Sequence, residues 1–180
     1  GDRVKHWITF NEAIVFCKSG YITGAHPPGL VNDQKKYFQA THNVFVAHAK
    51  CVEIYKNLKQ YGEIGITHVF NPAYNFDNKE ENIAATEHAN YYDTYWYYDP
   101  ILKGEYPEYV VELLKEKNLV PDWTNEELEL LKNTADKNDF IGLNYYQPQR
   151  IMKNTDGQQL VASRENSTGA PGNPSFDGFY

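Results

Sequence analysis

The sequence predicts an α/β fold built on parallel strands. Three short runs, at residues 4–10, 64–70 and 139–146, are rich in β-branched and aromatic residues, and helical segments separate them. Strands joined through helices pair in parallel, with right-handed crossovers. Because all three runs are apolar throughout, we expect protein to cover both faces of the sheet.

The first half of the chain alternates strand and helix. A short helix is expected at residues 13–19, followed by a rigid loop rich in Gly and Pro at residues 21–30. Asn32 or Asp33 can cap a long helix that runs to about Asn57. One face of this helix repeats at three- and four-residue intervals, through Phe38, Thr41, Val44, Phe45, His48, Val52 and Tyr55.

The second half continues with three helical segments. Residues 80–98 form one helical stretch, and its six aromatic residues within 91–98 go all the way round the helix. Most of these rings are expected to pack in the core, and stacking on sugars is the alternative. A further helix is expected over residues 107–118. Thr124 and Glu127 form a capping-box pair at the start of the last helix.

The segment 147–180 differs from the rest and is expected to be a hairpin and loop tail. Its two strands are placed at 150–153 and 158–162, on either side of an Asp156-Gly157 turn. Residues 163–180 are rich in Ser, Gly, Pro and Asn and are expected to form a loop.

Composition narrows the class of protein. The 24 acidic and 17 basic residues give a net charge of −7, which argues against a nucleic-acid or anionic-membrane surface. No apolar run approaches the roughly 20 residues of a membrane span, and the start does not resemble a signal peptide. Cys17 and Cys51 have no CxxC spacing, so we interpret them as reduced core thiols. These features indicate a soluble, cytoplasmic protein.

Polar side chains end the first and third strands. Asn11 and Glu12 close the first, and Asn144 and Tyr146 close the third on a shared face. Parallel strands would bring these groups to one end of the sheet, where an amide, a carboxylic acid and a phenol can bind hydroxyl groups. A glutamate in a dry pocket there can act as a general acid. The alternatives are that Glu12 caps the next helix and that Asn144 and Tyr146 only complete a strand end.

Other chemistries have less support. The sequence contains no HExxH motif, no His/Cys pairing at ligand spacing and no phosphate-binding or GxSxG motif. His42 and His48 are expected to be packing or capping residues. We therefore expect neither a metal nor a cofactor.

Seven segments, in the same order along the chain, resemble the family 1 glycoside hydrolases. They are WITFNEA, GYITGAHPPG, ATHNVFVAHAKCVEIYK, GEIGITHVF, YYDPILKGEYPEYV, EELELLK and DFIGLNYYQ. Within that family the sequence most resembles the bacterial cytoplasmic 6-phospho-β-glucosidases, with 6-phospho-β-galactosidases as close relatives. Ala13 stands where the family motif TFNEP has proline.

The resemblance implies a fold, a substrate and residue roles. Residues 1–180 would be a single fragment of a (β/α)8 TIM barrel, at about its fourth to sixth βα units. Glu12 would be the acid/base and Asn11 would bind the sugar 2-hydroxyl. Tyr146 would hydrogen-bond the nucleophile, with Asn144 as a supporting substrate-binding residue. The substrate would be a small β-glycoside, and the resemblance favours the 6-phosphorylated class.

A retaining glycosidase needs a second carboxylate about 5 Å from the first. We expect none at a strand's carboxyl end, because Glu63 and Asp139 stand at strand starts, while Glu53, Glu87 and Glu112 lie in expected helices. In the family that the sequence resembles, the nucleophile belongs to an ITENG-type motif, which would lie further along than this sequence reaches. We therefore expect the chain alone to be inactive, and open sheet edges to favour self-association. The alternative is a catalytically inactive remnant with a carbohydrate-binding or structural role.

Overall fold

A three-stranded parallel sheet organises the chain. The computed structural model describes residues 3–59, 61–146, 148–153 and 163–166. Strands β1 (His6–Asn11), β2 (Glu63–Val69) and β4 (Phe140–Asn144) pair in the order β1-β2-β4, all in parallel. The predicted parallel α/β sheet is therefore confirmed, with β2 in the centre.

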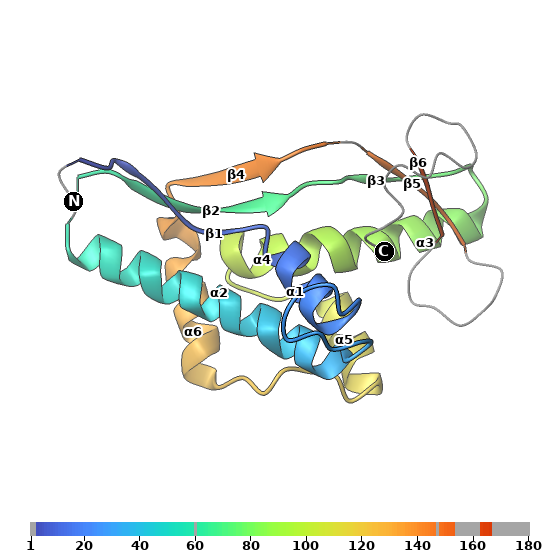
Figure 1. The fold of residues 1–180 in the computed structure, drawn as a ribbon, viewed down its shortest axis with the longest axis horizontal. Helices are drawn as coiled ribbons and strands as arrows, with labels where there is room; N and C mark the ends of the chain where they lie inside the picture. Colours follow the sequence, from blue (N-terminus) through green and yellow to red (C-terminus); the bar gives the residue numbers. More distant parts are fainter. Residues whose placement is uncertain (1–2, 60, 147, 154–162, 167–180) are drawn as a thin grey trace.

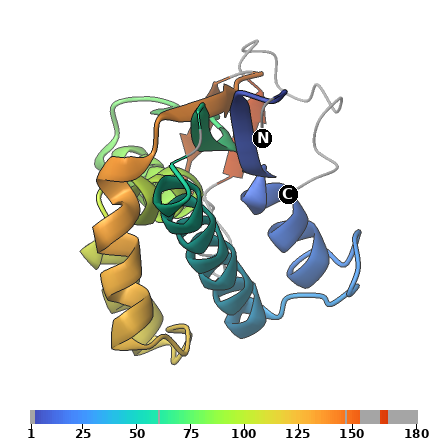
Figure 2. The ribbon, with the colours of Figure 1, turned by 90° about the vertical axis from the view of Figure 1, so that its left-hand side faces the viewer.

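The helices gather under one face of this sheet (Figures 1 and 2). They include α1 (Ala13–Tyr21), α2 (Gln34–Asn57), α4 (Trp96–Leu102), α5 (Glu108–Glu116) and α6 (Asn125–Thr134). No helix in the described part of the chain is long and apolar enough to cross a membrane.

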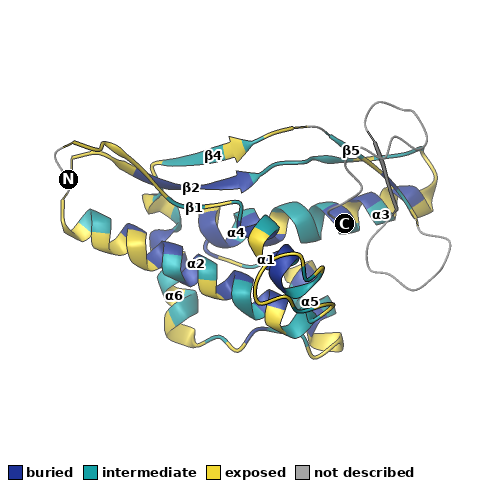
Figure 3. Ribbon diagram, in the orientation of Figure 1, coloured by how far each residue is buried: buried dark blue, intermediate teal, exposed yellow. Residues whose placement is uncertain are grey.

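The expectation that protein covers both faces of the sheet is wrong for the described residues. Ile8 on β1 is 53% exposed and Leu143 on β4 is 55% exposed, while β2 is buried along most of its length (Figure 3). The two outer strands are exposed because each has only one neighbouring strand in the described sheet and helices pack against only one of its faces. The face opposite the helices is mixed in polarity, because it carries Ile8 and Phe140 but also Thr67 and Asn144.

Helix α2 forms the centre of the packed layer. Its N-cap is Asp33, whose side chain accepts a hydrogen bond from the Lys36 N–H, and it ends at Asn57 as predicted. The indole of Trp96 donates to Thr41 Oγ1 over 2.9 Å, which joins α4 to α2 within the core. The capping box of Thr124 and Glu127 is also confirmed at α6.

The aromatic segment is not one continuous α-helix. Helix α3 (Glu80–Asn90) passes through a π-helical turn, η1 (Tyr91–Tyr95), into α4. Trp96 and Tyr97 are fully buried, in agreement with the expectation that these aromatics pack, whereas Tyr95 is exposed.

A second, smaller sheet continues beyond the carboxyl ends of β2 and β4 (Figure 1). It consists of β3 (Ala73–Asn75), β5 (Gln149–Met152) and β6 (Ser163–Asn166), with β5 parallel to β3 and antiparallel to β6. The buried side chain of Ile151 packs this sheet against α3.

The predictions for the tail are correct only in part. The strand expected near 150–153 is confirmed, but residues 163–166 form a strand where a loop was expected, and β3 was not expected at all. Residues 154–162, with the predicted turn and second hairpin strand, lie outside the described part of the chain. The strand at 163–166 carries no apolar alternation, so its pairing with β5 shows only in three dimensions.

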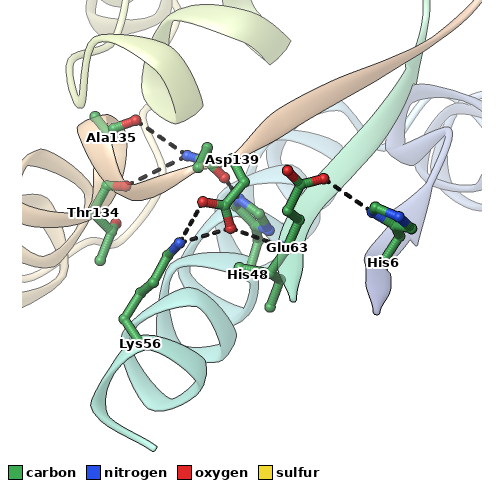
Figure 4. Close-up of polar contacts among 9 residues, drawn as sticks. His6, His48, Lys56, Glu63, Thr134, Ala135 and Asp139 are labelled. Carbon is green, nitrogen blue, oxygen red and sulfur yellow. Dashed lines mark hydrogen bonds and ion pairs between the residues drawn. The ribbon is translucent and has the colours of Figure 1, made fainter. Parts of the chain in front are cut away.

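A polar network holds the amino ends of the strands (Figure 4). The Asp139 carboxylate accepts the Ile64 N–H over 2.8 Å, and both of its oxygens lie 2.6 Å from Lys56 Nζ. Burial acts to raise the pKa of Asp139, but the hydrogen bonds from Lys56 and Ile64 and the Lys56 charge hold it below its ordinary value. His6 and Glu63 form a more exposed contact of 2.9 Å on the other side of β2.

Three buried histidines, His42 and His48 on α2 and His68 on β2, pack in the core. His48 contacts Thr9 Oγ1 through Nδ1 and Asn138 Oδ1 through Nε2, each over 2.8 Å. His42 lies against Tyr106, so the prediction that these two histidines pack in the core is confirmed. Desolvation by burial lowers the pKa of both His48 and the neighbouring His68 to about 4.

The two cysteines differ in their surroundings. Cys17 is buried in α1, and desolvation raises the pKa of its thiol to about 12. Cys51 is exposed on α2, so the prediction that both are core thiols is wrong for Cys51. It falls between the buried positions of the helix, on the face that points to solvent.

Candidate active site

An irregularity at the end of β1 sets the direction of Glu12. The register between β1 and β2 shifts between Ile8 and Asn11, and the Glu12 N–H then donates to the Thr67 carbonyl over 2.8 Å. Glu12 itself has φ 56° and ψ 58°, the left-handed region that non-glycine residues rarely adopt. Such conformations concentrate at functional sites, where surrounding contacts hold them in place.

The side chain of Glu12 does not cap helix α1. The residue occupies the N-cap position of α1, but its side chain makes no capping hydrogen bond. The carboxylate instead contacts Asn144, at the end of β4. Glu12 therefore stands at the N-cap position, as the helix-cap interpretation expected, but its side chain bonds another strand end and not the helix.

Asn144 links the ends of the two outer strands. Its Nδ2 donates to Glu12 Oε1 over 2.7 Å and to Asn11 Oδ1 over 3.0 Å. The structure therefore brings together three of the four predicted site residues, Asn11, Glu12 and Asn144, at the carboxyl end of the sheet. Asn11 is exposed, and the other two are half-buried.

Tyr146 is the fourth predicted residue and stands apart from this cluster. It lies two residues beyond the end of β4 and is 70% exposed. No hydrogen bond joins it to Asn11, Glu12 or Asn144 among the contacts of the described residues.

Two contributors were not singled out from the sequence. The Thr67 carbonyl anchors the Glu12 backbone, and the Tyr98 hydroxyl donates to the Val69 carbonyl over 3.4 Å beneath the end of β2. Burial raises the pKa of Tyr98 to about 12, so this phenol stays neutral. A backbone carbonyl has no sequence signal, and Tyr98 was one of many aromatics expected only to pack.

The cluster can hold a polar ligand and exchange a proton with it. Glu12 has one oxygen bonded to Asn144, and its Oε2 has no hydrogen-bond partner among the described residues. Within the described main sheet and its flanks, Glu63 and Asp139 lie at the opposite, amino ends of the strands. No group of three or more His, Cys, Asp or Glu residues able to hold a metal occurs in the described ranges.

Comparisons with known proteins agree with this arrangement. The model of glycosyl hydrolase family 1 matches residues 1–177. The chain is 37% identical over 180 residues to a 6-phospho-beta-galactosidase of Clostridium acetobutylicum, covering 98% of this chain and 37% of that protein. It is 35% identical over 173 residues to the aryl-phospho-beta-D-glucosidase BglC of Bacillus subtilis, covering 96% of this chain and 35% of the relative.

Solved structures show the same relationship. The family 1 β-glucosidase of Thermotoga maritima superposes with a TM-score of 0.79 at 32% identity, covering 92% of this chain and 36% of that one. The chain thus spans about a third of the length of the relatives it matches. Its open parallel sheet, with helices on one face, is part of a (β/α)8 barrel. The chain belongs to glycosyl hydrolase family 1.

Proposed function

We propose that the chain carries the acid/base part of a retaining β-glycosidase that hydrolyses 6-phospho-β-glucosides. Glu12 protonates the leaving oxygen and later accepts a proton from water, and Asn11 binds the sugar 2-hydroxyl. The observation that carries the proposal is the Glu12 carboxylate itself, which leaves its helix uncapped and contacts Asn144 at the carboxyl end of the sheet. Relatives named for phospho-galactoside and phospho-glucoside hydrolysis support the substrate class.

The second carboxylate of the reaction comes from outside the described main sheet. A retaining pair is about 5–5.5 Å apart, and the sheet carboxylates other than Glu12 lie at its far end. Tyr146, with its exposed phenol, is proposed to hydrogen-bond that nucleophile once it is present. By itself the chain is proposed to bind but not to turn over a β-glycoside. The lack of a carboxylate pair in the described main sheet also supports the alternative, an inactive carbohydrate-binding or structural remnant. The two free cysteines are in keeping with a reducing, cytoplasmic setting.

A chimaera tests the proposal. The chain replaces the aligned segment of the Clostridium acetobutylicum relative, and hydrolysis is measured on a nitrophenyl β-glucoside 6-phosphate, its unphosphorylated form and a 6-phospho-disaccharide. General acid catalysis contributes about 10²–10⁴-fold, so Glu12→Gln is expected to slow glycosylation of the disaccharide by that order and of the activated nitrophenyl substrate far less.

Glu63→Gln is the matched control, because this carboxylate stands at the amino end of β2. It is expected to leave both rates unchanged. Equal losses on both substrates with Glu12→Gln would contradict the acid role. A chimaera without activity would favour the inactive remnant. If the isolated chain turned over a β-glycoside and Glu12→Gln abolished this activity, the proposal that the chain lacks the second carboxylate would be contradicted.

A further inference from the structure

The side chain of Asn144 makes two contacts with one nitrogen. From the end of β4 it reaches past the central strand to Asn11 and Glu12 at the end of β1. A side-chain amide has two N–H donors on its nitrogen and acceptor lone pairs on its oxygen. One N–H therefore serves Glu12 Oε1 and the other serves Asn11 Oδ1.

These contacts fix the orientation of all three groups. An ionised carboxylate only accepts hydrogen bonds, so the Asn144 nitrogen, and not its oxygen, must face Glu12. The same nitrogen meets the Asn11 oxygen, and the Asn11 nitrogen is consequently turned away from Asn144. Asn11 is exposed, so its two N–H donors are available to a ligand.

We propose that Asn144 is a positioning residue that sets which atoms Asn11 and Glu12 offer to the ligand. Asn11 offers N–H donors, which suit a hydroxyl oxygen, and Glu12 offers Oε2. This inference rests on the proposed glycosidase function and assigns Asn144 a role through its neighbours and not through contact with the sugar.

The assignment has a consequence for proton transfer. When Glu12 is neutral, Oε1 remains the carbonyl oxygen that accepts from Asn144, so the proton resides on Oε2. Oε2 gives this proton to the glycosidic oxygen as its bond to the anomeric carbon breaks, and the leaving group departs as an alcohol. The second carboxylate, which the proposed function places outside the described main sheet, bonds to the anomeric carbon in the same step. In the second half of the reaction Oε2 takes a proton from water, the water oxygen bonds to the anomeric carbon, and the bond from that carbon to the second carboxylate breaks.

The first test uses the unmodified chain. Side-chain amide exchange is measured by NMR on 15N-labelled protein, with exposed Asn57 as the reference. The Asn144 amide protons are expected to exchange at least about tenfold more slowly than those of Asn57, while those of Asn11 exchange as fast as the reference. Protection of Asn11 in place of Asn144, or of neither, would overturn the proposal.

The second test exchanges donor and acceptor. In Asn144→Asp two carboxylates face each other, and in Asn144→Asp combined with Glu12→Gln the new glutamine can donate to the new aspartate. We expect the double variant to recover about tenfold or more in the folding equilibrium constant over the additive expectation. Asn11 must then reverse its amide to donate to the new aspartate, so slow exchange is expected to move to the Asn11 protons.

If Asn144 had only a structural role, the double variant would regain stability, but the Asn11 amide protons would still exchange fast. That result would overturn the proposal. So would stability changes of the two single variants that simply add in the double variant. Neither readout needs turnover. If the double variant does not recover stability, the hydrolysis assay can still support Glu12 as the acid. If the hydrolysis assay does not support Glu12 as the acid, the amide protection of Asn144 can still be observed. The two proposals therefore fail separately.

Discussion

Replacing Glu12 by glycine is expected to make the folded chain more stable than replacing it by alanine. Both substitutions remove the carboxylate and its bond to Asn144, so their difference isolates the backbone at φ 56° and ψ 58°. The left-handed conformation costs a residue with a Cβ about 1–2 kcal/mol. Glycine loses about 0.4–1 kcal/mol of this advantage, because its unfolded chain has more freedom.

The expected net preference for glycine is about 0.5–1 kcal/mol, or a melting temperature about 1–4 °C higher for a chain of this size. Urea denaturation of the two variants measures it. The control is the same pair of substitutions at Lys50, an exposed position within α2, where alanine should be favoured by about 1 kcal/mol. Alanine equal to or better than glycine at residue 12 would refute the claim that this site stores backbone strain.

Three further outcomes are expected. His48 and His68 stay neutral in the folded chain, with pKa values of about 4, but take up protons near pH 6.5 when unfolded, so stability should fall as pH drops from about 6.5 to 4. The free energy of unfolding falls by up to about 1.4 kcal/mol per pH unit per histidine. Urea titrations at several pH values should show a shallower slope of this free energy against pH for His68→Leu, and an unchanged slope would contradict this origin. Gly65→Ala should lose about 1–3 kcal/mol, since the new Cβ would lie 2.2 Å from the Phe140 carbonyl oxygen of β4, and a variant within 0.5 kcal/mol of the wild type in urea would count against that packing. The isolated chain should self-associate through its open apolar strands, and Leu143→Lys should weaken association in sedimentation equilibrium; a monomer at about tens of micromolar would exclude this.

Local signals in the sequence predicted most elements of the fold. Asp33 and the pair Thr124 and Glu127 mark helix starts through side chains that bond the nearby backbone, and such caps depend on a few adjacent residues. Features that depend on distant partners were not predictable in the same way. Apolar residues such as Ile8 and Leu143 indicate a surface that needs cover, but not whether a described element provides it.

The candidate site also combines features that the sequence predicts with features that it does not. Strand ends at Asn11 and Asn144 could be placed from the sequence, since parallel pairing brings carboxyl ends together. The contact that joins them follows the register shift in β1 and the left-handed backbone at Glu12, and neither has a sequence signal such as glycine. Tyr146 illustrates the limit, because beyond Asn144 the strand has ended and alternation no longer determines where a side chain points.

The position of Asn144 also depends on contacts at the opposite end of its strand. A shift of one residue in the pairing of β4 with β2 would turn every β4 side chain to the other face and remove the amide from Glu12. The Asp139 carboxylate opposes that shift, because it accepts the Ile64 N–H and binds Lys56 of α2 just before β4 begins. Five residues later this register places Asn144 opposite Val69, at the end of the central strand. The polar network at the amino ends therefore helps to determine the hydrogen-bond geometry at the carboxyl ends, and the acid/base cluster follows from strand register as much as from the residues that compose it.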